Sequence, residues 1–155
     1  MDSNTNTLID PRYIIRLSGE QFESDLSCLG EQLARLLNCI EQETKQLSWY
    51  AFDVFGSTHQ SLDILFPRPY CKIGNTVDLV NKVKRVVQFH SGVFIGAHRE
   101  TKIDWDVDNL PETEEGEGLQ HPSAVIEIRS FDCSYFEIYG IDNRMERKIT
   151  SCCEK

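Results

Sequence analysis

The stretch SAVIEIRSFDCSYFEIYG, residues 123–140, carries the clearest structural pattern in this chain of 155 residues. Apolar and polar side chains alternate on both sides of a short break at 131–133, and a period of two is typical of half-buried β-strands. The pattern predicts an antiparallel hairpin with one buried face and one mixed face. The residues expected on the buried face are Ala124, Ile126, Ile128, Phe136 and Ile138.

Outward from the hairpin, short segments rich in β-branched and aromatic residues predict further strands. These segments are 13–17, 48–55, 62–66 and 89–97. Apolar residues at steps of three and four predict a long helix from a Ser18–Gln21 capping box to about residue 44. A second helix is expected over 77–87, with Thr76 as its N-cap.

This order of elements predicts one α+β domain over residues 1–155, with a mainly antiparallel sheet and two helices packed on one face. The polar ends, 1–11 and 150–155, are expected to be frayed. Apolar residues make up 40% of the chain, and a mean hydropathy of −0.37 is ordinary for a soluble protein. No apolar run approaches the length of a membrane span.

The polar start MDSNTNTLIDP has neither the basic nor the apolar region of a signal peptide, so we expect a cytoplasmic protein. Six cysteines are present, and no pair has CxxC spacing. In a chain that can form a core and has no secretion signal, reduced thiols are expected.

The segment IDWDVDNLPETEEGEG, residues 103–118, holds seven carboxylates and no Lys or Arg. It supplies much of the net charge of −9, and a second acidic segment spans 20–43. Nucleic-acid binders carry a basic stripe, so this distribution argues against nucleic acid as a partner. We interpret 104–121 as an acidic loop that favours a basic protein partner, or else as a loop that only keeps this surface solvated.

Aromatic residues near these carboxylates are of the types that anchor protein interfaces. Trp105 lies inside the acidic loop, while Tyr135 and Tyr139 lie on the mixed face of the last strand. The predicted partner-binding residues are Asp104, Trp105, Asp106, Asp108, Glu112, Glu114, Glu115, Glu117, Tyr135 and Tyr139.

Calcium binding is the alternative use of the acidic loop. Asp104, Asp106, Asp108 and Glu115 fall at positions 1, 3, 5 and 12 of an EF-hand loop. Position 6 is an asparagine where the EF-hand has glycine, position 8 is a proline, and the flanking sequences are not helical. Because of these departures from the EF-hand pattern, calcium binding is the second hypothesis.

Nothing in the sequence makes a case for catalysis. There is no GxSxG or SxxK motif, no catalytic-cysteine signature and no metal-ligand spacing among the four histidines. We therefore expect a non-enzymatic protein without a cofactor; an enzyme with residues dispersed along the chain is the third hypothesis.

The segments SWYAFDVF, LFP, GNTVDLVNKV and FHSGVF, together with IEIRSFDCSYFEIYG, resemble small bacterial α+β immunity proteins of polymorphic-toxin and contact-dependent inhibition systems. The resemblance covers about residues 48–140 by order of elements, and the long acidic insert departs from it. It implies a cytoplasmic inhibitor of one cognate toxin, and many such toxins are cationic nucleases.

Overall fold

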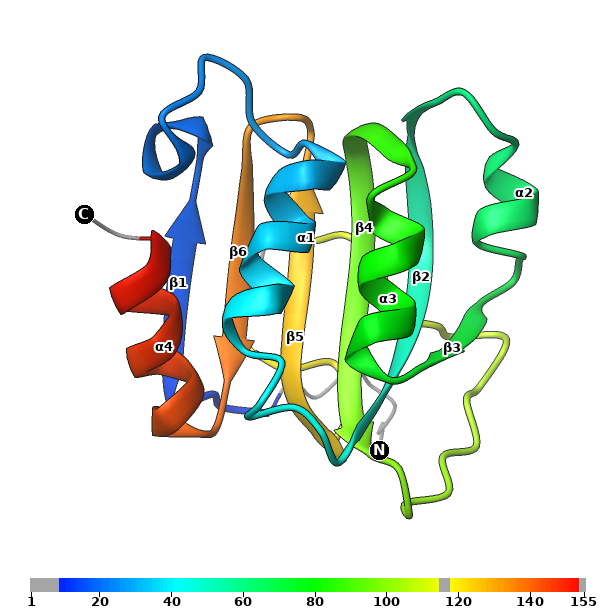
Figure 1. Ribbon diagram of the computed structural model, residues 1–155. Coiled ribbons are helices and arrows are strands. Elements are labelled where there is room, and N and C mark those ends of the chain that lie inside the picture. The colour runs from blue at the N-terminus through cyan, green and yellow to red at the C-terminus, as the bar shows by residue number, and fades with distance from the viewer. Residues whose placement is uncertain (1–8, 115–117, 154–155) are drawn as a thin grey trace.

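The computed structural model describes residues 9–114 and 118–153. Its strands are β1 Tyr13–Leu17, β2 Leu47–Thr58, β3 Cys71–Gly74, β4 Val86–His98, β5 Ala124–Phe131 and β6 Tyr135–Gly140. They form one six-stranded sheet in the order β1-β6-β5-β4-β2-β3 (Figure 1), and every neighbouring pair is antiparallel. The predicted α+β class with an antiparallel sheet is confirmed.

Helices cover one face of the sheet, which we call the front face. They are α1 Gly30–Cys39, α3 Thr76–Val83 and α4 Asn143–Cys153. In Figure 1, α4 lies before β1, α1 before β6 and β5, and α3 before β4. A short helix, α2 Leu62–Leu65, lies beside β2, and a 3₁₀ helix, η1 Gly19–Phe22, follows β1. No helix in these described ranges is both long enough and apolar enough to cross a bilayer.

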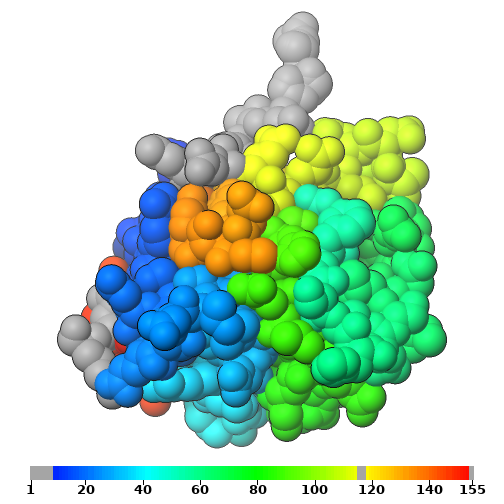
Figure 2. All heavy atoms as spheres, turned by 90° about the horizontal axis from the view of Figure 1, so that it is seen from above, coloured from blue at the N-terminus to red at the C-terminus, as the bar shows by residue number. Residues whose placement is uncertain are grey.

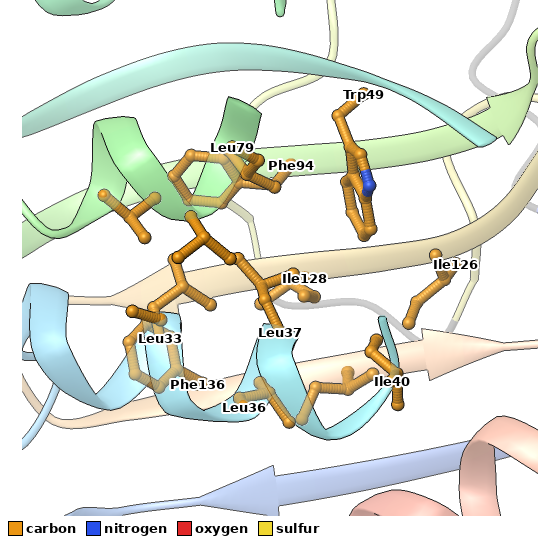
Figure 3. Close-up of a cluster of buried hydrophobic side chains, with 14 of the residues drawn as sticks. Leu33, Leu36, Leu37, Ile40, Trp49, Leu79, Phe94, Ile126, Ile128 and Phe136 are labelled. Atoms are coloured by element: carbon orange, nitrogen blue, oxygen red, sulfur yellow. The ribbon is translucent and has the colours of Figure 1, made fainter. Parts of the chain in front are cut away.

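The main core lies between the front helices and the sheet. Leu33, Leu36 and Leu37 of α1 and its C-cap Ile40 are fully buried and point toward the strands (Figure 3). Ile126, Ile128 and Phe136, which the alternation places on the buried face of the hairpin, meet them from the sheet side. Each buried Leu or Ile stabilises the fold by roughly 1.5–3 kcal/mol, so the packing of α1 on the hairpin is a major contribution.

The predicted hairpin is confirmed as β5 and β6, with Ile128 paired opposite Ile138. Asp132 and Cys133 form its turn with φ of 50° and 62°, the left-handed pair that matches the twist of a tight hairpin. Its mixed face is not open, however. Every residue of β5 is buried, which means that a second layer covers the back face of the sheet.

The long helix predicted from Ser18 to about residue 44 is wrong in its first half. Ser18 and Gln21 do form a capping box, but they cap only η1. The chain then turns at Cys28, whose φ is 62°, and α1 begins at Gly30. The carbonyl of Cys28 accepts from the N–H of Phe89 on β4, so a tertiary pairing replaces the helical hydrogen bonds here. Leu26 is consequently exposed.

Three smaller predictions also need correction. The segment 62–66, where a strand was expected, consists of the helix α2 Leu62–Leu65 and its C-cap Phe66. The second front helix is capped by Asn75, not by Thr76. Thr76 is instead buried and accepts a hydrogen bond from Nε1 of Trp49 at 2.9 Å. The end of the predicted helix 77–87 belongs to β4, which starts at Val86.

The C-terminal segment is helical from Asn143 to Cys153, so the expectation of a frayed end at 150–155 is wrong for its described part. Met145, Ile149 and Cys153 form the buried face of α4. A disulfide joins Cys39 at the end of α1 to Cys152 of α4, so the expectation that all cysteines are reduced is wrong for this pair. At the other end, Ile9 pairs with Leu119 through two backbone hydrogen bonds, while 1–8 lie outside the described residues.

Candidate functional site

The described parts of the connection from β4 to β5, residues 99–114 and 118–123, cross the back face of the sheet; we call them the strap. Viewed from above in Figure 2, its residues (yellow) lie on the side of the sheet opposite the front helices (cyan and green). The predicted acidic loop is therefore the second covering layer. Its described carboxylates are exposed, namely Asp104, Asp106, Asp108, Glu112 and Glu114. The two remaining acidic positions, Glu115 and Glu117, lie outside the described residues.

An aromatic cluster attaches the first half of the strap to the sheet. The Trp105 indole packs against Phe52 and Tyr50 of β2, with ring centroids 4.7 and 5.3 Å apart in edge-to-face geometry. It also lies 4.7 Å from the His121 ring at the other end of the strap. Such aromatic pairs each add roughly 0.5–1.5 kcal/mol beyond the burial of area. Trp105 is half-buried and packs inward, where the sequence predicted an anchor for a partner.

A buried arginine attaches the second half. Arg129 of β5 is 1% exposed and donates from Nε to Oε2 of Glu127 at 2.7 Å. Its other nitrogens donate to strap carbonyls, Nη1 to that of Glu114 at 3.2 Å and Nη2 to that of Gly118. Because charged groups inside a protein must be paired and fully hydrogen-bonded, the guanidinium fixes the strap backbone in place.

Gln120 completes this network from the strap side. Its backbone N–H and its side-chain amide donate to the two carboxylate oxygens of Glu127, at 2.8 and 2.7 Å. The same amide joins two parts of the strap, because Nε2 donates to the carbonyl of Glu112 and Oε1 accepts from its N–H, both at 3.0 Å. Glu127 is thus neutralised by Arg129 and held by Gln120.

A distortion in β2 supplies a third attachment. Asp53 has a φ of 56° at an irregularity in the β2–β4 register between Phe52 and Phe55. Bulges of this kind redirect side chains. Here the Asp53 carboxylate accepts from the backbone N–H of Thr113 at 2.9 Å, and the Thr113 hydroxyl accepts from the N–H of Gly92 at 3.0 Å.

The two tyrosines predicted as partner contacts differ in their surroundings. Tyr139 is fully buried, donates its hydroxyl to Glu137 and lies beneath the Arg129 guanidinium, 4.1 Å from the ring centroid. The prediction that it lies on an accessible face is therefore wrong. Tyr135 is half-buried, with the Arg16 guanidinium 4.0 Å above its ring. Arg16 in turn donates to Glu137 at 2.7 Å.

The exposed carboxylates influence one another. A side-chain hydrogen bond with Glu114 raises the pKa of Glu112, and burial and the negative charges of Glu114 and Asp53 act in the same direction. Like charges that raise a neighbour's pKa are close together in space. The strap therefore concentrates negative charge near Glu112 on a backbone that Arg129, Gln120 and Asp53 hold in position.

The calcium alternative gains no support from the geometry. In the described ranges, the one group of at least three potential ligand residues whose atoms converge consists of cysteines, and it does not include Asp104, Asp106 or Asp108. The Asp106 carboxylate accepts from the N–H of Asp108 at 3.0 Å, which is a local turn within the strap. Glu115, the expected bidentate ligand, lies outside the described residues.

The residues that hold the strap were missed by sequence reasoning, which counted Glu127 and Arg129 only as the polar half of an alternating strand. The sequence did contain a signal for the pairing of these two side chains. Residues two apart on a strand share a face, so the IEIRS segment places a carboxylate and a guanidinium side by side. Their burial was not predictable, because it depends on a strap that passes over them.

Protonation of His121 is expected to weaken the strap. Burial lowers the pKa of His121 below its ordinary 6.5, and Nδ1 accepts from the N–H of Ser123 at 2.9 Å, which a protonated ring cannot do. As the pH falls below about 6.5, the unfolded chain takes up the proton first, so this contribution to stability is present above that pH and is lost below it.

Chemical denaturation at about pH 7 and pH 5 tests this expectation. The wild type should lose more of its unfolding free energy over this interval than His121→Asn, which keeps an acceptor but does not titrate. His90→Asn, at an exposed position on β4, is the matched control and should follow the wild type. Equal losses in wild type and His121→Asn would show that this ring does not titrate in a buried site.

Comparisons with known proteins give no relative from which a function can be transferred. No family model matches the chain, and neither a curated protein nor a solved structure matches it. The resemblance to immunity proteins therefore stays a prediction.

Proposed function

We propose that this protein is a non-enzymatic binding module that uses the exposed carboxylates of the strap to bind a basic protein. The observation that carries the proposal is the contrast between the two sides of the strap. Trp105, Thr113 and Gln120 are attached to the sheet, whereas Asp104, Asp108 and Glu112 face solvent. The attachments bury the apolar back face of the sheet, and they also fix the direction in which these carboxylates point.

Attachment matters for binding because a preorganised surface loses little conformational entropy when a partner docks. Clustered charge of one sign also steers an oppositely charged partner and raises its association rate, by roughly 10-fold to 1,000-fold at low salt. An ordered acidic strap thus combines rapid encounter with a defined orientation of the bound partner.

In its specific form, the proposal is that the partner is a bacterial toxin domain and that this protein is its cytoplasmic immunity protein. A cationic nuclease has a basic substrate cleft, and a row of carboxylates can occupy that cleft in place of phosphates. Inhibition of this kind requires charge and shape from the inhibitor and no chemical step.

The partner is found by affinity purification of the tagged protein from its native host in low salt, followed by a high-salt wash. One stoichiometric basic protein that leaves in high salt is the expected result, because contacts between exposed charges are screened. A retained partner that is acidic or unaffected by salt would contradict the proposal.

With the partner in hand, the quadruple variant Asp104→Asn, Asp106→Asn, Asp108→Asn and Glu112→Gln tests the strap directly. We expect association at low salt to slow by about tenfold or more, because the steering charge is removed. The unfolding midpoint should change little, because these side chains are exposed and an asparagine at position 106 keeps an oxygen that can accept from the N–H of residue 108.

The matched control removes four exposed carboxylates elsewhere, with the changes Glu20→Gln, Asp25→Asn, Glu31→Gln and Asp63→Asn. It alters the net charge equally, so association should slow much less than in the strap variant. Equal slowing in both variants would mean that overall charge acts and the strap is not the binding surface. A loss of stability in the strap variant alone would make the carboxylates structural.

A further inference from the structure

Three cysteines meet where α1 ends against α4. The sulfur atoms of Cys39, Cys152 and Cys153 all lie within 4.8 Å of one another. Cys39 is the last residue of α1, and the other two are the last residues of α4. Cys153 is fully buried and lies outside the disulfide, whereas Cys39 and Cys152 are half-buried and line a groove of about 540 Å³.

We propose that the reduced protein binds one thiophilic metal ion through these three thiolates, with three-coordinate Cu⁺ as the ion whose ligand number matches. Metal–sulfur bonds of about 2.3 Å place the sulfurs of a trigonal site about 4 Å apart. All three sulfurs lie within 4.8 Å of one another, but two of them are bonded, so after reduction Cys39 and Cys152 must move apart to about 4 Å to admit the ion. Thiolates select soft ions such as Cu⁺ and Zn²⁺ over hard ions such as Mg²⁺ and Ca²⁺.

The charges around the cluster favour a metal over a reactive thiol. Low-pKa catalytic cysteines are typically found at helix N-termini, but all three of these residues lie at helix C-termini, which disfavour an isolated thiolate. A bound cation supplies the positive charge that several adjacent thiolates require. Arg35 and Lys84 line the same groove against a single carboxylate, Glu31, so the charged side chains of the groove favour a complex with remaining negative charge.

The disulfide makes this site dependent on redox state. A dithiol reductant transfers two electrons and two protons to the Cys39–Cys152 bond, giving two thiols, and is itself oxidised to a disulfide. The metal ion then displaces the thiol protons. In the oxidised protein two of the three sulfurs are bonded to each other, so the complete ligand set exists only after reduction.

The test is an anaerobic titration of the full chain with Cu⁺ in competition with a chromophoric Cu⁺ chelator. We expect one tightly bound Cu⁺ per reduced protein and none at this site in the oxidised protein. Cys152→Ser and Cys39→Ser should weaken binding by at least about tenfold, the lower limit even for an outer-shell change at a metal site. Cys133→Ser, on the β5–β6 turn, is the matched control and should bind as the wild type does.

Cys153 is buried, so Cys153→Ala is used at this position, and circular dichroism under reducing conditions checks that each variant is folded. A folded Cys153→Ala that binds Cu⁺ as tightly as the wild type would overturn the three-thiolate site. Failure of the reduced wild type to compete with the chelator, or loss of binding in Cys133→Ser, would also overturn it.

Discussion

Arg129→Met should destabilise the protein by about 3–5 kcal/mol, because removal of one partner leaves an uncompensated charge in the interior. Arg129 and Glu127 are 1% and 0% exposed, and their side chains are 2.7 Å apart. After the substitution Glu127 keeps only its bonds from Gln120, and the carbonyls of Glu114 and Gly118 lose the donors from the guanidinium. Equilibrium denaturation in urea measures the change.

The double variant Glu127→Gln/Arg129→Met separates charge from packing. A neutral glutamine can remain buried without a cation, so we expect the double variant to be more stable than Arg129→Met alone. Arg68→Met is the control. Arg68 pairs with Asp63 where both side chains are about two-thirds exposed, and such a surface pair contributes about 1 kcal/mol at most.

The strap should also loosen in Arg129→Met. Because the guanidinium donates to two strap carbonyls, its loss should increase cleavage between residues 104 and 120 by a protease under native conditions. If the free energy of unfolding falls by less than about 1 kcal/mol and cleavage does not increase, the network does not hold the strap, and the proposed preorganisation of its carboxylates is wrong.

The parts of the fold that sequence predicted are those with strong local periodicity. The hairpin of β5 and β6 follows from alternation within residues 123–140. The helix α1 corresponds to the second half of the helix predicted from Ser18 to about residue 44, and it follows from the spacing of Leu33, Leu36, Leu37 and Ile40. These two predictions are confirmed because each helix or strand buries the face on which its own residue spacing places the apolar side chains.

The errors occur where distant contacts replace local preferences. Residues 18–29 have helical spacing, yet a Cβ on Gly30 would lie 2.0 Å from the carbonyl oxygen of Val86, so α1 starts where the chain meets β4 closely. That glycine within the apolar pattern was a visible warning. The helix α4 was also detectable, because Met145, Ile149 and Cys153 recur every fourth residue.

The candidate site was predicted in part. The exposed carboxylates of the strap, from Asp104 to Glu114, lie where charge patterning placed them. The inward position of Trp105 and the burial of Tyr139 were not predictable, since both follow from the path of the strap across β2 and β5. The spacing of residues in a sequence predicts which face of a single helix or strand is buried. The packing of a long connection on a sheet depends on residues from several strands.

The Cys39–Cys152 disulfide should be worth about 4–5 kcal/mol in the oxidised protein. The two cysteines are separated by 113 residues, and in the chain-entropy account a cross-link over such a loop strongly restricts the unfolded state. The bond also joins the C-terminal helix α4 to α1, where Met145, Ile149 and Cys153 form the buried face of α4.

Cys152→Ser measures this contribution, because residue 152 is half-buried and serine leaves little space unfilled. In oxidising buffer its unfolding midpoint should be well below that of the wild type, and in reducing buffer the two should nearly coincide. Cys133→Ser should match the wild type in both buffers, because Cys133 lies outside the bond. A wild type of equal stability in both buffers, with the bond verified by mass spectrometry, would contradict the expectation. That result would mean that the unfolded chain is already compact without the bond, so that the cross-link restricts it little further.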